Sequence, residues 1–138
     1  GSRLYELCEE NGYLANPSST DLVNTRSVIR APGVHQEEIA ATAYDMNLTV
    51  NFVHNYNLKV GNHKTAIHYL ANVCEKYPDH AFAHYYLARA YEASGAPERG
   101  AHHDELFSGI VREDAWWRGH AERHGLVPTP AARVEGLP

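Results

Sequence analysis

Apolar side chains recur at spacings of three and four along most of the chain, which is the pattern of helices that bury one face. The longest such run covers residues 36–58. Its predicted buried stripe consists of Ile39, Ala43, Met46, Val50 and Val53. Shorter helices are predicted over residues 3–10, 63–76, 80–94, 97–111 and 114–124. Because no segment is rich in strand signals, the pattern predicts an all-α fold.

Local signals predict where several of these helices begin. Asn62 is placed to cap the helix over 63–76, and Asp79 to cap the helix over 80–94. Pro97 suits the first position of a helix, because that position needs no backbone N–H donor. Two helices are followed by stop signals: Asn11-Gly12 follows the helix over 3–10, and Gly95 follows the helix over 80–94.

The chain repeats itself at a fixed interval. Gly61 and Gly95 are 34 positions apart, and their neighbours match at the same offset. The matched pairs are Val53 with Leu87, Asn57 with Tyr91, Ala66 with Gly100, and Asn47-Leu48 with Ala81-Phe82. This interval is the length of the helix–turn–helix unit of tetratricopeptide repeats, which the chain resembles over about residues 47–124. The resemblance implies antiparallel helix pairs stacked as a short solenoid.

The match weakens in the second unit, where Gly100 and Asp104 are expected to make a poor second helix. A third, incomplete unit is expected from Ala115. We therefore divide the chain into an N-terminal connector (1–34), a helical repeat domain (35–125) and a disordered proline-containing tail (126–138). Residues 1–2, Gly-Ser, resemble a tag-cleavage scar, which indicates a piece of a longer protein.

Composition excludes several classes of protein. The 138 residues carry a formal net charge of −5, which argues against a nucleic-acid surface. No apolar run is long enough to span a membrane, and no signal peptide is visible. Cys8 and Cys74 are interpreted as two thiols in a reducing cytoplasm rather than as a disulfide framework. A cytoplasmic protein without nucleic-acid or membrane partners is expected.

A second resemblance covers more of the chain. The runs that carry it are residues 4–7 (LYEL), 11–14 (NGYL), 29–32 (IRAP), 37–39 (EEI), 43–52 (AYDMNLTVNF) and 77–80 (YPDH). They resemble the region after the catalytic barrel in cobalamin-binding radical S-adenosylmethionine enzymes, together with a helical extension that some members carry. The CxxxCxxC cluster motif and a cobalamin domain are absent from this sequence. The resemblance therefore implies a non-catalytic accessory domain without a cofactor of its own. An iron–sulfur cluster, S-adenosylmethionine and cobalamin would belong to its parent enzyme, for instance a methyltransferase.

Such a domain would dock a protein or carrier-bound partner, or close the active site of the preceding part of its own chain. The alternative is a stand-alone tetratricopeptide adaptor that binds a peptide. With few repeats, an exposed end is also free to pair with a second copy. The tetratricopeptide resemblance places a concave groove at Asn51, Asn55, Phe82, Tyr85, Arg89, Trp116 and Arg123. The alternative to a groove is that the domain is a structural spacer, in which these side chains are only exposed to solvent.

The ten histidines suggest a third alternative, a metal-binding helical domain. The pairs His80/His84 and His120/His124 have the spacing of neighbours on one helix face, and residues 102–105 (HHDE) add further ligand types. Because no HExxH motif occurs, the histidines are interpreted as structural, and no metal site is predicted. Nucleophile elbows, phosphate-binding loops and dinucleotide motifs are also missing from the sequence, so no catalytic residue is predicted.

Overall fold

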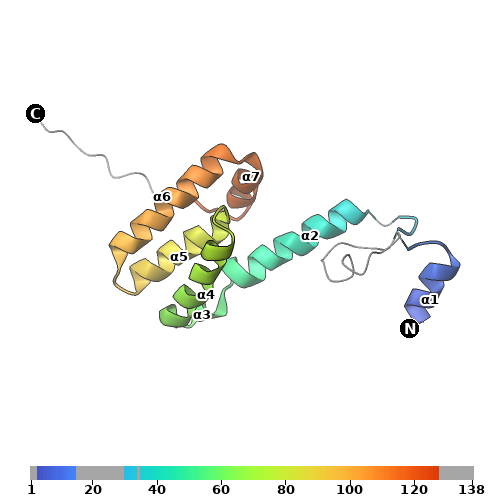
Figure 1. The fold of residues 1–138 in the computed structure, drawn as a ribbon, viewed down its shortest axis with the longest axis horizontal. Helices are drawn as coiled ribbons and strands as arrows, with labels where there is room; N and C mark the ends of the chain where they lie inside the picture. The colour runs from blue at the N-terminus through green and yellow to red at the C-terminus, as the bar shows by residue number, and fades with distance from the viewer. Residues whose placement is uncertain (1–2, 15–29, 34, 128–138) are drawn as a thin grey trace, which may run out of the picture. The chain divides into compact units, whose positions relative to one another are not determined.

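The computed structural model describes residues 3–14, 30–33 and 35–127, and every regular element within them is a helix. The helices in chain order are α1 (Arg3–Glu10), α2 (Gln36–Leu48), the π-helical turn η1 (Thr49–Val53), α3 (Tyr56–Lys59), α4 (His63–Lys76), α5 (Ala81–Ala93), α6 (Pro97–Glu113) and α7 (Ala115–Arg123), as Figure 1 shows. The prediction of an all-α fold is confirmed for these residues. None of the described helices is both long and apolar enough to cross a bilayer.

The chain divides into two compact units, residues 1–48 and 49–138. The boundary between these units falls after Leu48, inside the predicted long helix. In the first unit, α1 ends at the predicted Asn11-Gly12 signal, where Gly12 has a φ of 65°. Residues 15–29 of the expected connector and residues 128–138 of the expected tail lie outside the described residues.

The stripe predicted to be buried along residues 36–53 is largely exposed, so this prediction is wrong. Met46 and Val50 are 61% and 63% exposed, whereas Leu48 is fully buried and Phe52 nearly so. Among the described helices α2 has no extensive packing partner, which leaves its apolar residues exposed, whereas the π-helical turn over Thr49–Val53 packs on α5 and buries Phe52. A second helix, α3, then starts anew after Asn55.

The second unit repeats its helix starts at the interval found in the sequence. The first residues of α4 and α6, His63 and Pro97, are 34 positions apart. The first residues of α5 and α7, Ala81 and Ala115, are separated by the same interval. The turns before α4 and α6 contain Gly61 and Gly95, with φ of 75° and 83°, a left-handed conformation that glycine adopts without steric cost.

Capping side chains account for these helix starts. Asn62 caps α4 as predicted, with its side chain accepting a hydrogen bond from the Thr65 amide. Pro97 is the first residue of α6, also as predicted. The prediction for α5 is wrong, because His80 and not Asp79 is its N-cap. The Nδ1 atom of His80 accepts from the Ala83 amide at 3.2 Å, since an imidazole nitrogen can act as the capping acceptor.

Helix α5 is the centre of the second unit. It packs against α4 and most extensively against α6, and α6 in turn packs against α7. Figure 1 shows α5 and α6 lying side by side. Small side chains on α5 permit this close packing, and the largest fully buried side chains of the unit are Phe82, Leu87 and Phe107. Burial of this apolar surface is the main force that holds the helices together.

The two residues expected to spoil the second helix of the second unit are instead accommodated within α6, which runs for 17 residues. Gly100 is buried where α6 approaches α5, and a Cβ atom there would lie 3.0 Å from the Ala88 carbonyl oxygen. Asp104 is also buried, at the repeat position of the buried Leu70, and it forms an ion pair with Arg89 of α5. The expectation of a poor helix is therefore corrected.

We expect Gly100→Ala to lower the free energy of unfolding by about 1–2 kcal/mol, because the added methyl group presses on the backbone of α5. Gly119→Ala in α7 is the matched control, since nothing lies within 4 Å of the position that its Cβ atom would take. That change should raise stability by about 0.5–1 kcal/mol through helix propensity. Urea unfolding of both variants measures the difference. Equal stabilisation by the two substitutions would show that α5 and α6 are not in close contact at Gly100.

The adjacent tryptophans diverge, as expected for neighbours on a helix. Trp117 is buried against the rings of Phe82 and His80, with centroid distances of 6.0 Å and 4.8 Å, whereas Trp116 is 50% exposed. Neighbours on a helix diverge by about 100°, so the two rings cannot share the buried face.

Candidate functional site

The residues predicted to line a groove differ widely in accessibility. Asn51, Trp116 and Arg123 are exposed, and Asn55, Tyr85 and Arg89 are half-buried. Phe82 is fully buried, with its ring among those of Phe52, Trp117 and His124. The expectation for Phe82 is therefore corrected: it is a core residue and offers no surface to a partner.

Asn55 has a structural role of its own. Its side-chain oxygen accepts from the Leu58 amide at 3.2 Å and so caps α3, while its Nδ2 atom donates to the Asn51 carbonyl oxygen at 2.8 Å. The two hydrogen bonds of the Asn55 side-chain amide thus connect the π-helical turn to the start of α3. This contact accounts for Asn55 without invoking a ligand, whereas Asn51 contributes only its backbone carbonyl oxygen.

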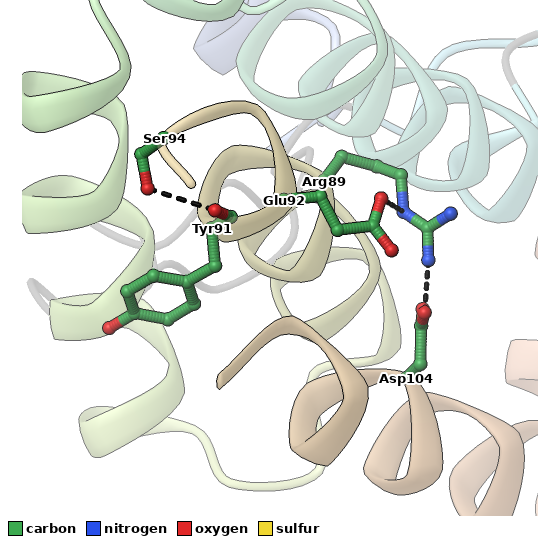
Figure 2. Close-up of polar contacts among 5 residues, drawn as sticks. All are labelled: Arg89, Tyr91, Glu92, Ser94 and Asp104. Atoms are coloured by element: carbon green, nitrogen blue, oxygen red, sulfur yellow. Dashed lines mark hydrogen bonds and ion pairs between the residues drawn. The ribbon is translucent and has the colours of Figure 1, made fainter. Parts of the chain in front are cut away.

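Arg89 also makes contacts within the protein, and Figure 2 shows them. Its guanidinium lies between Glu92 on the same helix, at 3.5 Å, and Asp104 of α6, to which it donates a hydrogen bond. Beside these contacts, Ser94 donates to the Tyr91 carbonyl oxygen at the end of α5. The charge of Arg89 compensates the nearly buried Asp104 carboxylate, because a buried charge is costly unless it is paired. Arg89 therefore stabilises the α5–α6 contact, whatever else it binds.

The predicted i, i+4 histidine pairs do not converge. His80 faces Phe52 and Trp117, whereas His84 faces His103 of α6. His120 packs against Trp116, and His124 against Phe82. In each pair the two rings contact different parts of the core, so neither pair forms a two-histidine ligand set.

A different set of metal-ligand types does come together in the second unit. Cys74 of α4, His84 of α5 and His103 of α6 each bring a ligand atom within 4.8 Å of the others. We call these three residues the Cys–His–His cluster. His84 is 3% exposed, Cys74 is buried and His103 is half-buried. Three consecutive helices of the second unit therefore each contribute one side chain to a single interior point.

Hydrogen bonds define the orientation of the two imidazoles. The Nε2 atom of His84 lies 2.9 Å from the Pro78 carbonyl oxygen, which can only accept, so Nε2 carries the proton. In the neutral ring the Nδ1 atom of His84 then has a free lone pair. It lies 2.9 Å from the Nδ1 atom of His103, whose ring stacks on Tyr91. The lone pair of His84 is thereby directed into the cluster.

Burial decides the protonation state of the cluster. It lowers the pKa of His84, and it lowers the pKa of His103 to about 4, an effect that the neighbouring His84 and His102 reinforce. Both imidazoles are therefore neutral near pH 7. Burial raises the pKa of the Cys74 thiol to about 11, so that thiol is protonated near pH 7 when nothing binds it.

This cluster was not predicted from the sequence, where histidines four residues apart and residues 102–105 suggested ligands but Cys74 was interpreted as a thiol without such a role. The signal was present in the helix pattern. Cys74 lies on the same stripe as Ala66 and Leu70 of α4, the face that packs on α5. His84 belongs to the inner face of α5 together with Leu87. What the pattern did not contain was the third helix, since His103 reaches the other two only through the packing of α6 on α5.

The described residues form an all-α fold whose second unit holds a largely buried Cys–His–His cluster and an exposed tryptophan on its last described helix. Comparison of the chain with family models, with curated proteins and with solved structures gives no match.

Proposed function

We propose that this chain is a non-catalytic helical docking domain that binds a segment of a protein partner. We further propose that it belongs to the tetratricopeptide type, with antiparallel helix pairs stacked as a short solenoid. On this proposal it serves as an accessory domain of a cobalamin-dependent radical S-adenosylmethionine enzyme. The stand-alone adaptor differs only in having no enzymatic parent.

The observation that carries the proposal is the recurrence of helix starts at one interval, 34 positions, from α4 to α6 and from α5 to α7. This is the unit length of tetratricopeptide repeats. Units of this kind bury their apolar faces against neighbouring units and leave an extended surface for partners. The positive-φ glycines Gly61 and Gly95 recur at the same interval, in the turn that precedes the second helix of each unit.

The side chains that remain accessible suit recognition of a protein segment. Trp116 offers a half-exposed indole and Arg123 an exposed guanidinium on α7, and Asn51 is exposed on the π-helical turn. Tryptophan and arginine are the side chains most enriched among residues that dominate interface energies. An arginine favours a carboxylate on the partner, because the guanidinium can hold both carboxylate oxygens. We therefore expect the bound segment to present an acidic side chain or a chain terminus.

The accessory role rests on the resemblance of residues 43–52 and 77–80 to an extension of radical S-adenosylmethionine enzymes. Within the second unit these runs are structural: residues 49–53 form the π-helical turn, and His80 caps α5. The proposal therefore expects the extension of those enzymes to have the same helical architecture as this chain. No chemistry is proposed for this chain itself.

Selection of displayed peptides on the wild-type chain, followed by Kd measurement through fluorescence polarisation, tests the docking function. We expect the double variant Trp116→Ala/Arg123→Ala to bind the selected peptides at least about tenfold more weakly, since loss of an interface anchor costs about 1–2 kcal/mol or more. Arg89 and Asn55 are less suitable probes, because their replacement also removes the Asp104 ion pair and the α3 cap.

The matched control is Tyr69→Ala/Arg112→Ala, which removes an exposed aromatic ring and an exposed guanidinium from α4 and α6. This control should bind as the wild type does. Circular dichroism of both double variants checks that the helices are intact. The proposal fails if no peptide is enriched, or if the Trp116/Arg123 variant binds within twofold of the wild type.

A further inference from the structure

We propose that the Cys–His–His cluster binds one divalent ion of the zinc type and thereby links α4, α5 and α6. Neither docking nor the resemblance to known families requires this site, so the inference goes beyond the proposed function. It is carried by the convergence of three ligand atoms from three helices on one interior point.

The distances are close to those of a coordinated ion. In a tetrahedral site with zinc–nitrogen bonds of about 2.0–2.1 Å, two nitrogen ligands lie about 3.3 Å apart. The Nδ1 atoms of His84 and His103 are 2.9 Å apart, and all three ligand atoms lie within 4.8 Å of one another. Shifts of a fraction of an ångström to about one ångström, which side-chain rotation supplies, would centre an ion among them.

The outer hydrogen bond of His84 matches the arrangement found around metal-binding imidazoles. A ligating histidine almost always donates its other ring N–H to a carboxylate, a carbonyl oxygen or water, which holds the ring in place. The Nε2 atom of His84 donates to the Pro78 carbonyl oxygen at 2.9 Å and leaves Nδ1 directed at His103. Pro78 lies in the turn between α4 and α5, so one backbone group orients the ring within the cluster.

The donor set selects the kind of ion. A thiolate and two imidazoles favour zinc and related transition metals, whereas magnesium and calcium prefer oxygen ligands. The Cys74 thiol would bind as the thiolate and release its proton to the solvent. Three protein ligands leave a fourth tetrahedral position for water, and the half-buried His103 lies on the side where solvent reaches the cluster. The ion would cross-link three helices, of which only α5 and α6 are joined within the cluster by a hydrogen bond, that of His84 with His103.

Titration of the metal-free 138-residue chain with Co²⁺ tests the site. A tetrahedral thiolate site should give intense visible d–d bands and a sulfur-to-cobalt charge-transfer band, and Zn²⁺ should displace the cobalt at one equivalent. A hundredfold excess of Zn²⁺ over its Kd should raise the midpoint of thermal unfolding by at least about 5 °C, because the ion binds the folded state only.

Two matched pairs of variants make the result specific. Cys74→Ser and Cys8→Ser each remove a buried thiol, and His103→Asn and His102→Asn each remove one of two adjacent imidazoles of α6. We expect Cys74→Ser to abolish the charge-transfer band, and His103→Asn to weaken metal binding at least about tenfold. Cys8→Ser and His102→Asn should bind as the wild type does. Far-UV circular dichroism shows whether each variant retains its helices.

Absence of tetrahedral cobalt bands in the wild-type chain would overturn the proposal. The cluster would then be a hydrogen-bonded histidine pair beside a buried thiol. Equal loss of binding in His102→Asn and His103→Asn would overturn it as well, because the metal would then be held by the exposed histidines. Neither outcome involves a peptide, so failure of the metal site and failure of the docking function are distinguishable.

Discussion

Replacing Phe82 with alanine is expected to lower the free energy of unfolding by about 3–5 kcal/mol. The Phe82 side chain has no exposed surface, and its ring lies among those of Phe52, Trp117 and His124. These rings come from the π-helical turn, from α7 and from the residue after α7. Truncation would therefore open a cavity where three segments of the second unit meet, and the surrounding structure could refill it only in part.

Urea unfolding followed by circular dichroism measures this change, with Tyr69→Ala as the control. Tyr69 is an aromatic residue of α4 with 59% of its surface exposed, so its removal should change stability by no more than about 0.5 kcal/mol. Were Phe82 instead a surface anchor for a ligand, the two substitutions would have similarly small effects. That result would contradict the placement of Phe82 in the core.

Leu87→Ala is expected to cost about 2–5 kcal/mol, since Leu87 is a fully buried residue in the middle of α5. It belongs to the helix that contacts both α4 and α6, so the cavity would weaken two helix contacts at once. The repeat register also depends on this position, because Leu87 is the repeat partner of Val53.

The matched control is Leu106→Ala in α6, where the leucine is 38% exposed and the expected loss is below about 1 kcal/mol. Both variants are compared by urea unfolding under the same conditions. Surface substitutions usually change stability by no more than about 0.5 kcal/mol. A loss that small for Leu87→Ala would mean that the inner face of α5 is misassigned and that the repeat register is misplaced.

Helix ends were predictable from the sequence where their causes are local. Asn62 caps α4 through its own side chain, and Pro97 starts α6 because of its own ring geometry. Gly61 and Gly95 occupy the turns before α4 and α6, because glycine tolerates a positive φ. Each of these effects depends on a few neighbouring residues, so it can be recognised without knowledge of the tertiary fold.

The face that each helix buries was less predictable. Spacing of apolar residues placed Met46 and Val50 inside, but Leu48 and Phe52 are buried instead, because burial depends on which segments find a packing partner. Asp104 shows the opposite case, a charged residue at a buried position. Its burial depends on Arg89 of another helix, and the two are 15 positions apart in sequence. Single-helix periodicity contains no information about either effect.

The candidate sites show the same limit. Repeat position assigned both Arg123 and Phe82 to a groove, but Arg123 is exposed whereas the Phe82 side chain is in the core. The Cys–His–His cluster was not predictable from spacing, because its three members lie on three helices. Only the packing of α4, α5 and α6 brings their ligand atoms within 4.8 Å of one another.

The central claim is that the second unit binds a protein segment across its last helices. Amide hydrogen exchange of the wild-type chain, with and without a saturating selected peptide, tests it most directly. We predict slower exchange on binding in α7 (Ala115–Arg123) and in the adjoining part of α5 (Ala81–Ala93). Unchanged exchange in both helices, with protection confined to α2 or absent everywhere, would contradict it.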